Sequence, residues 1–273
     1  MKVTWSIFPK FYKHLKVDEL AGLVREVGLD TTNLVIREGY WVTPGNLAGE
    51  TKAFVEAMSK EGIEIRFATA GFVPTDLVKD DTPLAVLADN GITEFRMSYF
   101  RVENDDVQAS IAEARRQMEQ IVPICEKRGI RAVYQVHHGT LAPHSLAAWM
   151  LVHDLPSKAV GVMLDPGNQI NEGFEDWRRA ALLLKDHWVA TGVKDMAWRR
   201  GEDAADDPTK GWSRDWVPVC DGVINWKAVM DAMRTIPFEG TFVFMPFYNH
   251  EEPALMTKGL KKGVAYLREI VGE

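Results

Sequence analysis

Two kinds of apolar segment alternate along the chain. Short, nearly continuous apolar runs are typical of strands buried on both faces, and longer segments between them carry apolar residues at helical spacing. The short runs predict strands at residues 3–8, 33–36, 63–68, 94–99, 132–136, 160–164, 188–193 and 242–245. The longer segments predict helices at residues 17–28, 47–61, 82–90, 104–129 (with Asn104 as N-cap), 145–153, 174–186, 225–234 and 253–270.

The strict alternation of these elements predicts the fold class. Eight strands and eight helices joined by mostly short connections indicate an α/β protein whose parallel sheet is covered by helices. Eight such units in 273 residues fit a (β/α)8 TIM barrel better than an open, doubly wound sheet. Because no linker or low-complexity tract divides the chain, we expect residues 1–273 to form one domain.

Composition and charge narrow the class of partner. A net charge of −7 argues against nucleic acid and anionic membranes as main partners. The chain has neither a run of about 18 apolar residues nor the apolar core of a secretory signal at its start. Cys125 and Cys220 lie far apart and form no metal-ligand spacing, so free thiols are expected. These features predict a cytoplasmic protein.

Polar residues follow several of the predicted strands. In a barrel of this class the active site lies at the carboxyl ends of the strands, so these positions are the candidate site. Asp165 ends the apolar run 160–164, and Lys194 directly follows the apolar run of the seventh strand, where a scaffold has little use for an ammonium group. We expect one pocket to contain Gln135, His137, Asp165, Asn168 and Lys194, with Arg37 nearby.

Each of these positions also has a purely structural interpretation. Asp165 is suited to cap the turn that Pro166 begins, and Arg37 and Glu38 are suited to form a surface ion pair. His138 is expected to face solvent or bond a loop carbonyl. For Asp195 we favour a capping role over catalysis.

The order of these motifs resembles the xylose isomerase-like sugar phosphate isomerase/epimerase family of TIM barrels, which includes the endonuclease IV branch. The resemblance extends over residues 131–248, and the ordered series is more specific than any one piece. The pieces are 134–140 (YQVHHGT), 164–168 (LDPGN) followed by 172–173 (EG), 192–195 (GVKD), 216–226 (WVPVCDGVINW) and 238–240 (FEG).

The resemblance implies a divalent metal (Mn, Mg or Zn) held by a Glu, an Asp, a His and a Glu on strands five to eight, with two carboxylates moving a proton between sugar carbons. The present chain keeps only Asp165 of this set, and it has Gln135, Gly192 and Met245 near the other positions. Asp165 is thus the metal ligand that the family position implies. Since one anionic ligand holds Mg²⁺ or Mn²⁺ poorly, we expect a degenerate site without a tightly bound metal.

Two functions remain open at this point. The first is an isomerase or epimerase of small sugars or sugar phosphates, with His137, Lys194 and Asp165 as catalytic residues. In that hypothesis His137 is the base, while Lys194 or Arg37 stabilises negative charge without a metal. The second is a non-catalytic, carbohydrate-binding relative; endonuclease activity fits the acidic charge poorly.

The segment 197–223 is too long for a passive connection in a compact barrel. It combines tryptophans, including Trp198, with arginines and an acidic run at 202–207. Indole faces pack on sugar rings, so we expect a lid in which Trp198 joins Arg37, Gln135 and Asn168 in binding substrate. The alternative is that the tryptophans anchor the loop or form a subunit contact in a homo-oligomer.

Overall fold

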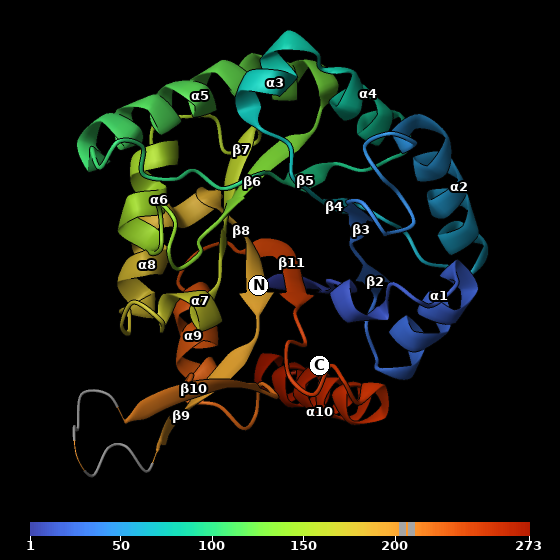
Figure 1. Ribbon diagram of the computed structural model, residues 1–273, viewed down its shortest axis with the longest axis vertical. Coiled ribbons are helices and arrows are strands. Elements are labelled where there is room, and N and C mark those ends of the chain that lie inside the picture. The colour runs from blue at the N-terminus through green and yellow to red at the C-terminus, as the bar shows by residue number, and fades with distance from the viewer. Residues whose placement is uncertain (202–205, 207–210) are drawn as a thin grey trace.

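A ring of parallel strands lies at the centre of the molecule, and helices surround it (Figure 1). The computed structural model describes residues 1–201, 206 and 211–273. The barrel sheet contains β1 (Lys2–Ile7), β2 (Thr31–Thr32), β3 (Leu34–Ile36), β4 (Phe67–Ala70), β5 (Glu94–Arg96), β6 (Arg131–Gln135), β7 (Val160–Leu164), β8 (Trp188–Val193) and β11 (Glu239–Phe244).

The ring is completed by one strand that is interrupted at Asn33. The strand β2 pairs with β1, and β3, which begins one residue after Asn33, pairs with β4. The Asn33 side chain connects its neighbours, because Ser6 Oγ donates to Asn33 Oδ1 (2.7 Å) and Asn33 Nδ2 donates to Thr69 Oγ1 (3.1 Å). Counting β2 and β3 as one strand gives the eight strands of the predicted barrel, and the predicted fold class is confirmed.

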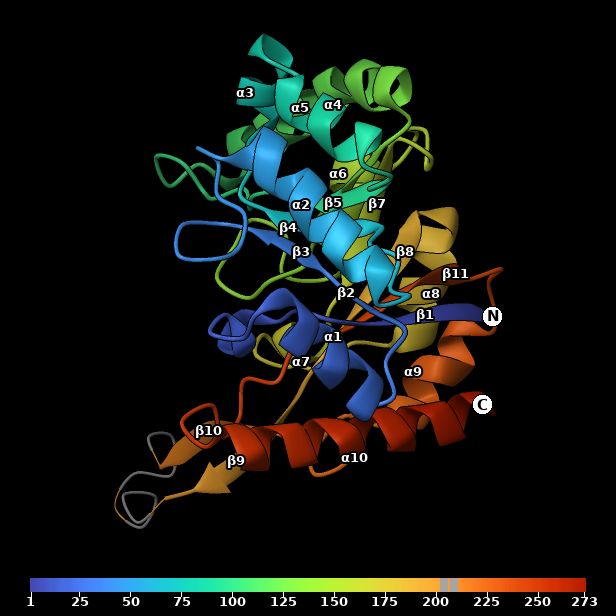
Figure 2. The same cartoon turned by 90° about the vertical axis from the view of Figure 1, so that its right-hand side faces the viewer.

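Helices follow the strands in sequence and cover the outside of the ring (Figure 2). The α-helices are α1 (Val17–Glu26), α2 (Leu47–Lys60), α3 (Pro74–Lys79), α4 (Thr82–Asp89), α5 (Val107–Arg128), α6 (Ser145–Val152), α7 (Pro166–Gln169), α8 (Trp177–Leu184), α9 (Trp226–Met233) and α10 (Pro253–Val271). Short 3-10 turns occupy η1 (Lys10–Tyr12) and η2 (Lys185–His187). In the described part of the chain no helix is both long and apolar enough to cross a membrane.

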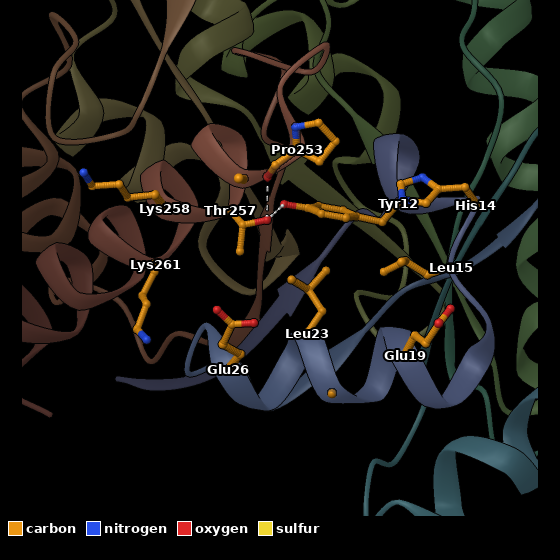
Figure 3. A pocket seen from close by; sticks show the side chains of 12 residues that line it. Tyr12, His14, Leu15, Glu19, Leu23, Glu26, Pro253, Thr257, Lys258 and Lys261 are labelled. Atoms are coloured by element: carbon orange, nitrogen blue, oxygen red, sulfur yellow. Dashed lines mark hydrogen bonds between the residues drawn. The ribbon is translucent and has the colours of Figure 1, made fainter.

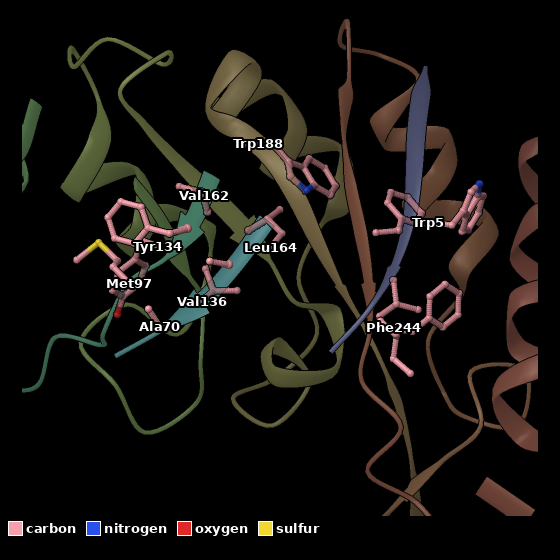
Figure 4. Close-up of a cluster of buried hydrophobic side chains, with 14 of the residues drawn as sticks. Trp5, Ala70, Met97, Tyr134, Val136, Val162, Leu164, Trp188 and Phe244 are labelled. Carbon is pink, nitrogen blue, oxygen red and sulfur yellow. The ribbon is translucent and has the colours of Figure 1, made fainter. Parts of the chain in front are cut away.

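The strands bury both of their faces, as their continuous apolar runs predicted. Successive side chains of a strand point to opposite faces, so Tyr134 of β6 packs toward the helices and Val133 packs toward the barrel interior. Figure 4 shows part of the helix-facing layer, including Tyr134, Trp188 and Trp5. The interior cluster consists of Phe8, Val35, Phe67, Val133, Met163, Val189, Ala190, Val243 and Met245.

Several predicted boundaries differ from the structure. The third strand is Phe67–Ala70 rather than 63–68, because Ile63 still bonds to the end of α2 through Met58 O (2.9 Å). Asp106, and not Asn104, caps α5 by accepting a hydrogen bond from Ala109 N, since Asn104 has a left-handed φ of 53°.

The segment 197–223 is also more regular than expected. It contains most of an antiparallel hairpin formed by β9 (Asp195–Arg200) and β10 (Trp212–Val217), which extends away from the barrel (Figures 1 and 2). Part of the predicted lid, residues 202–205 and 207–210, lies outside the described residues.

Candidate functional site

A cavity of about 200 Å³ opens at the carboxyl ends of the barrel strands. Its position is that of the active site in barrels of this class. The residues that line it are Phe8, Lys10, Arg37, Thr69, Arg96, Tyr99, Gln135, His137, Lys194, Met245 and Phe247.

Asp165 lies directly behind this cavity and is fully buried. Its Oδ1 accepts a hydrogen bond from the backbone N of Asn168 (2.9 Å), so the carboxylate caps α7 as the structural interpretation predicted. Its Oδ2 accepts from Gln135 Nε2 (2.7 Å) and Asn168 Nδ2 (2.9 Å), and it forms an ion pair with Lys194 Nζ (3.1 Å). The carboxylate therefore both caps α7 and holds the group of polar side chains together.

Lys194 connects Asp165 to the cavity. The side chain follows β8, is only 4% exposed, and lines the cavity. Its Nζ lies 5.0 Å from the ring centre of Trp216 and 5.2 Å from that of Phe247. Burial lowers the pKa of Lys194, whereas the adjacent Asp165 carboxylate acts in the opposite direction.

Two glycines provide the space for this ion pair. A Cβ on Gly192 would lie 2.5 Å from Asp165 Oδ2, and a Cβ on Gly167 would lie 2.6 Å from Lys194 Cγ. Both distances are shorter than a non-bonded contact allows. Gly192 stands near the position where the resemblance implies a histidine, so the buried carboxylate fills the space that a side chain at Gly192 would need.

His137 has one ring nitrogen fixed by the backbone. Its Nδ1 lies 2.7 Å from the carbonyl oxygen of His138, which requires the proton on Nδ1. Burial lowers the pKa of His137, and the positive charge of Lys194 adds to this effect. The imidazole is therefore neutral at pH 7, and Nε2 keeps a lone pair that is able to accept a proton.

Tyr99 and Gln135 fix the orientation of the amide that bonds to Asp165. Tyr99 Oη donates to Gln135 Oε1 (2.8 Å), which leaves Gln135 Nε2 directed at Asp165 Oδ2. Burial raises the pKa of the Tyr99 hydroxyl, so it remains a donor at neutral pH.

The structure brings together the five residues that were expected to converge. Gln135, His137 and Lys194 line the cavity, while Asp165 and Asn168 bond to that group from behind. Arg37 also lines the cavity, and within the described residues it forms no ion pair with Glu38.

The remaining polar residues named from the sequence have structural contacts. Asp195 accepts hydrogen bonds from Met196 N (2.8 Å) and Trp226 Nε1 (2.9 Å), while the N-cap of α9 is Asn225, so the capping role of Asp195 stays a prediction. His138 is partly exposed, and its Nδ1 lies 3.2 Å from both Asn168 Oδ1 and Asn171 Nδ2.

The tryptophan that reaches the site is not the expected one. Trp198 lies on β9, is 39% exposed, and does not line the cavity. Trp216 of β10 lies beside Lys194 instead.

Sequence reasoning also missed two cations, Lys10 and Arg96, which line the cavity. The sequence pattern could have indicated Arg96, because it is a charged residue inside a predicted apolar strand. Lys10 carried none.

The residues around Asp165 do not fit a divalent metal. Its Oδ2 is surrounded by amide N–H groups and an ammonium, which are donors and cannot bind a cation. Across the described residues, no group of three or more His, Cys, Asp and Glu side chains is placed to hold a metal ion.

A larger hollow of about 860 Å³ lies on the outside of the barrel between α1 and α10 (Figure 3). Tyr12 Oη bonds to Thr257 Oγ1 (3.0 Å) across it, and Glu19, Glu26 and Lys261 line its walls. None of the residues that line this hollow also lines the cavity at the strand ends, where the polar cluster lies, so the smaller cavity is the candidate site.

Comparison with known proteins matches the chain to one protein family. The sequence model described as xylose isomerase-like TIM barrel matches residues 21–270. No curated protein gives a sequence match.

Solved structures with the same fold were also found. A D-psicose 3-epimerase, solved in the presence of D-fructose, has a TM-score of 0.70 at 15% identity, covering 99% of this chain and 100% of that one. The IOLI protein with a bound zinc atom has a TM-score of 0.74 at 13% identity, covering 99% and 98%. A xylose isomerase-like TIM barrel protein from Mycobacterium smegmatis, in complex with magnesium, has a TM-score of 0.61 at 16% identity, covering 96% and 97%. At these identities the likeness shows the fold.

Proposed function

The chain belongs to the xylose isomerase-like TIM barrel family, and on that basis we propose that it interconverts isomers of a small carbohydrate by proton transfer. The observation that carries the proposal is a neutral histidine at the edge of a cationic cavity. His137 has a free Nε2, and it shares the cavity with Lys194 and Arg37. The chain is similar in fold to a D-psicose 3-epimerase and to a D-tagatose 3-epimerase-like protein, which agrees with this class of reaction.

The proposed reaction uses His137 Nε2 as the base. It takes the proton from the carbon beside the substrate carbonyl, and the electron pair of that C–H bond forms an enediolate. Return of the proton from the His137 imidazolium to the former carbonyl carbon, with transfer of the proton of the neighbouring hydroxyl to the former carbonyl oxygen, completes an isomerisation. In an epimerisation a water molecule delivers a proton to the opposite face of the original carbon, and the His137 imidazolium then releases its proton to solvent.

Lys194 stabilises the enediolate in this proposal, and Arg37 adds a second positive charge to the same cavity. Fixed positive charges in a cavity with little water stabilise a developing oxyanion without rearranging during the reaction. Asp165 keeps the Lys194 ammonium in place, and Gln135 and Asn168 orient Asp165. The roles of Gln135 and Arg37 in substrate binding rest on their place in the cavity wall. Asn168 acts in this scheme through Asp165, and a substrate-binding role of Trp198 stays a prediction.

The test is exchange of carbon-bound hydrogen with solvent. Aldoses, ketoses and their phosphates are incubated with the protein in D₂O, and loss of the proton signal next to the carbonyl is followed by ¹H NMR. We expect His137→Gln to reduce exchange by about 10²- to 10⁴-fold, the usual contribution of a general base. His14→Gln, which changes an exposed histidine outside this cavity, is the matched control and should leave exchange unchanged.

The pH profile gives a second readout. Because burial lowers the pKa of His137 below its usual value of about 6.5, exchange should be at its plateau at pH 7 and decline only at more acidic pH. A ligand that binds this cavity without any exchange would favour the second hypothesis, a non-catalytic carbohydrate-binding protein.

A further inference from the structure

Three cations line the candidate site without an anionic partner among the residues that the structure describes. Lys10 follows β1, Arg37 follows β3, and Arg96 ends β5, so they come from neighbouring parts of the barrel rim. Nowhere in residues 1–201, 206 and 211–273 does a carboxylate form an ion pair with any of the three. Their exposure decreases from Arg37, which is exposed, through the half-buried Lys10 to Arg96, which is 6% exposed.

The contacts of Arg96 do not compensate its charge. Its Nη1 donates to the carbonyl oxygen of Met97 (3.3 Å), and its guanidinium lies 5.0 Å from the ring centre of Tyr99. A buried guanidinium is normally paired with a carboxylate, because removing it from water is otherwise unfavourable. Arg96 is therefore a buried cation whose counter-ion has to come from outside the described protein residues.

Nearby positive charges make an external anion at this part of the cavity more favourable. Burial lowers the pKa of Lys10, and the charges of Arg37 and Lys194 lower it further. Burial and the charge of Arg37 act in the same direction on the pKa of Arg96. The cavity thus gathers four cationic side chains, while Asp165 supplies one negative charge, which leaves a formal excess of three positive charges (4 − 1).

The polar groups occupy two different parts of the cavity wall. Gln135, His137 and Lys194, which we assign to proton transfer, come from β6 and β8 and the residues after them. Lys10, Arg37 and Arg96 come from the region of β1, β3 and β5, the half of the ring that continues from β6 through the β5–β6 pair. A ligand in the cavity is thus able to touch both groups with different ends.

We infer that Lys10, Arg37 and Arg96 bind a carboxylate or phosphate group of the substrate, which is therefore a small sugar acid or sugar phosphate rather than a neutral sugar. Guanidinium forks match the paired oxygens of both anions. The cavity volume of about 200 Å³ favours a ligand of few carbons, because sites for drug-sized ligands begin at about 300 Å³. The inference rests on the proposed function for the sugar part of the ligand.

Binding of matched probes tests the inference. Isothermal titration compares D-glycerate, glycerol 3-phosphate and glycerol, and then D-erythronate, D-erythrose 4-phosphate and erythritol, at low and high salt. The two anions in each series distinguish a carboxylate site from a phosphate site. We expect at least one anionic probe to bind at least 10-fold more tightly than the polyol of its series. This preference should shrink as salt is raised.

Variants identify the residues responsible. Arg37→Gln and Lys10→Met should each weaken binding of the preferred anion by about 10- to 100-fold, the usual range for one charge-assisted hydrogen bond. Lys13→Met removes an exposed positive charge near the mouth that does not line the cavity, and it should leave the affinity unchanged. Arg96→Lys keeps the buried charge while losing the fork, so it should weaken binding without unfolding the protein.

The outcomes separate this inference from the proposed function. If no anionic probe binds more tightly than its polyol, or if Arg37→Gln and Lys10→Met both bind anions as the unmodified chain does, the inference is wrong. Exchange on neutral sugars without any preference for anions would overturn the inference and leave the proposed function standing. Selective anion binding without exchange on any sugar, sugar acid or sugar phosphate would support the inference and overturn the proposed function.

Discussion

Replacing Lys194 with methionine should destabilise the protein, because it leaves the Asp165 carboxylate buried without its ammonium partner. The Nζ–Oδ2 distance is 3.1 Å, and both side chains are almost fully buried. At an effective dielectric constant of about 20, two unit charges at this distance attract each other by roughly 5 kcal/mol. Loss of hydration opposes this attraction, and breaking a buried pair by removing one partner costs about 3–5 kcal/mol.

The lower end of that range is expected here. Asp165 keeps the hydrogen bonds from Gln135 and from the side chain and backbone of Asn168 after the substitution, so its charge is still partly compensated. We therefore expect the free energy of unfolding of Lys194→Met to fall by about 3 kcal/mol at pH 7.

Urea unfolding followed by circular dichroism measures the change. A double-mutant cycle with Asp165→Asn isolates the interaction between the two charges from the other effects of each substitution. The double variant should be more stable than the sum of the two single losses predicts, because neither charge is then left alone. Lys262→Met, which breaks the exposed ion pair with Asp221 (2.7 Å), is the matched control and should change stability far less. A Lys194→Met protein within about 0.5 kcal/mol of the unmodified chain, or a cycle without coupling, would refute this reasoning.

Two further predictions concern the residues around this pair. Burial raises the pKa of Asp195 from 3.8 to about 6, so the folded protein binds its proton more tightly than the unfolded chain. This contribution to stability is present at pH 4 and is lost as the pH rises through about 6, by roughly 3 kcal/mol. Urea unfolding between pH 4 and 7 should therefore show the unmodified chain losing stability relative to Asp195→Asn. If the unfolding free energies of the two proteins change in parallel with pH, this prediction is wrong. Gly192→Ala should destabilise the protein by about 1–3 kcal/mol through overpacking against Asp165. In contrast, a Cβ on Gly49 in α2 would meet open space, so Gly49→Ala should be neutral or stabilising in thermal unfolding. Equal effects of the two substitutions would contradict the close contact between Gly192 and Asp165.

The sequence was sufficient to predict which residues meet at the site, but only where an apolar run marks the end of a strand. Asp165 and Lys194 each follow such a run, and the barrel geometry then places both at the same rim. Arg96 was missed because the apolar and aromatic residues after it predicted a strand to residue 99. The strand ends at Arg96, which puts its side chain at the mouth.

Other parts of the site depend on contacts that local sequence does not determine. Lys10 lies in a 3-10 turn after β1 and looks like an ordinary surface lysine in sequence. Trp216 reaches Lys194 because β10 pairs with β9 in a register that places Trp216 opposite Met196. Nothing in the spacing of the tryptophans specifies that register, so the sequence did not indicate that Trp216, rather than Trp198, lies beside Lys194.

Gln135, Gly192 and Lys194 belong to one arrangement around Asp165. Gln135 and Lys194 both donate to Asp165 Oδ2, and Gly192 leaves the space in which that oxygen lies. A carboxylate surrounded by donors is already compensated, so it has little to offer a metal ion. A glutamate at position 135 would place a second carboxylate beside the Lys194 ammonium. A divalent metal at Asp165 Oδ2 would therefore have to displace the Lys194 ammonium and would need further anionic ligands.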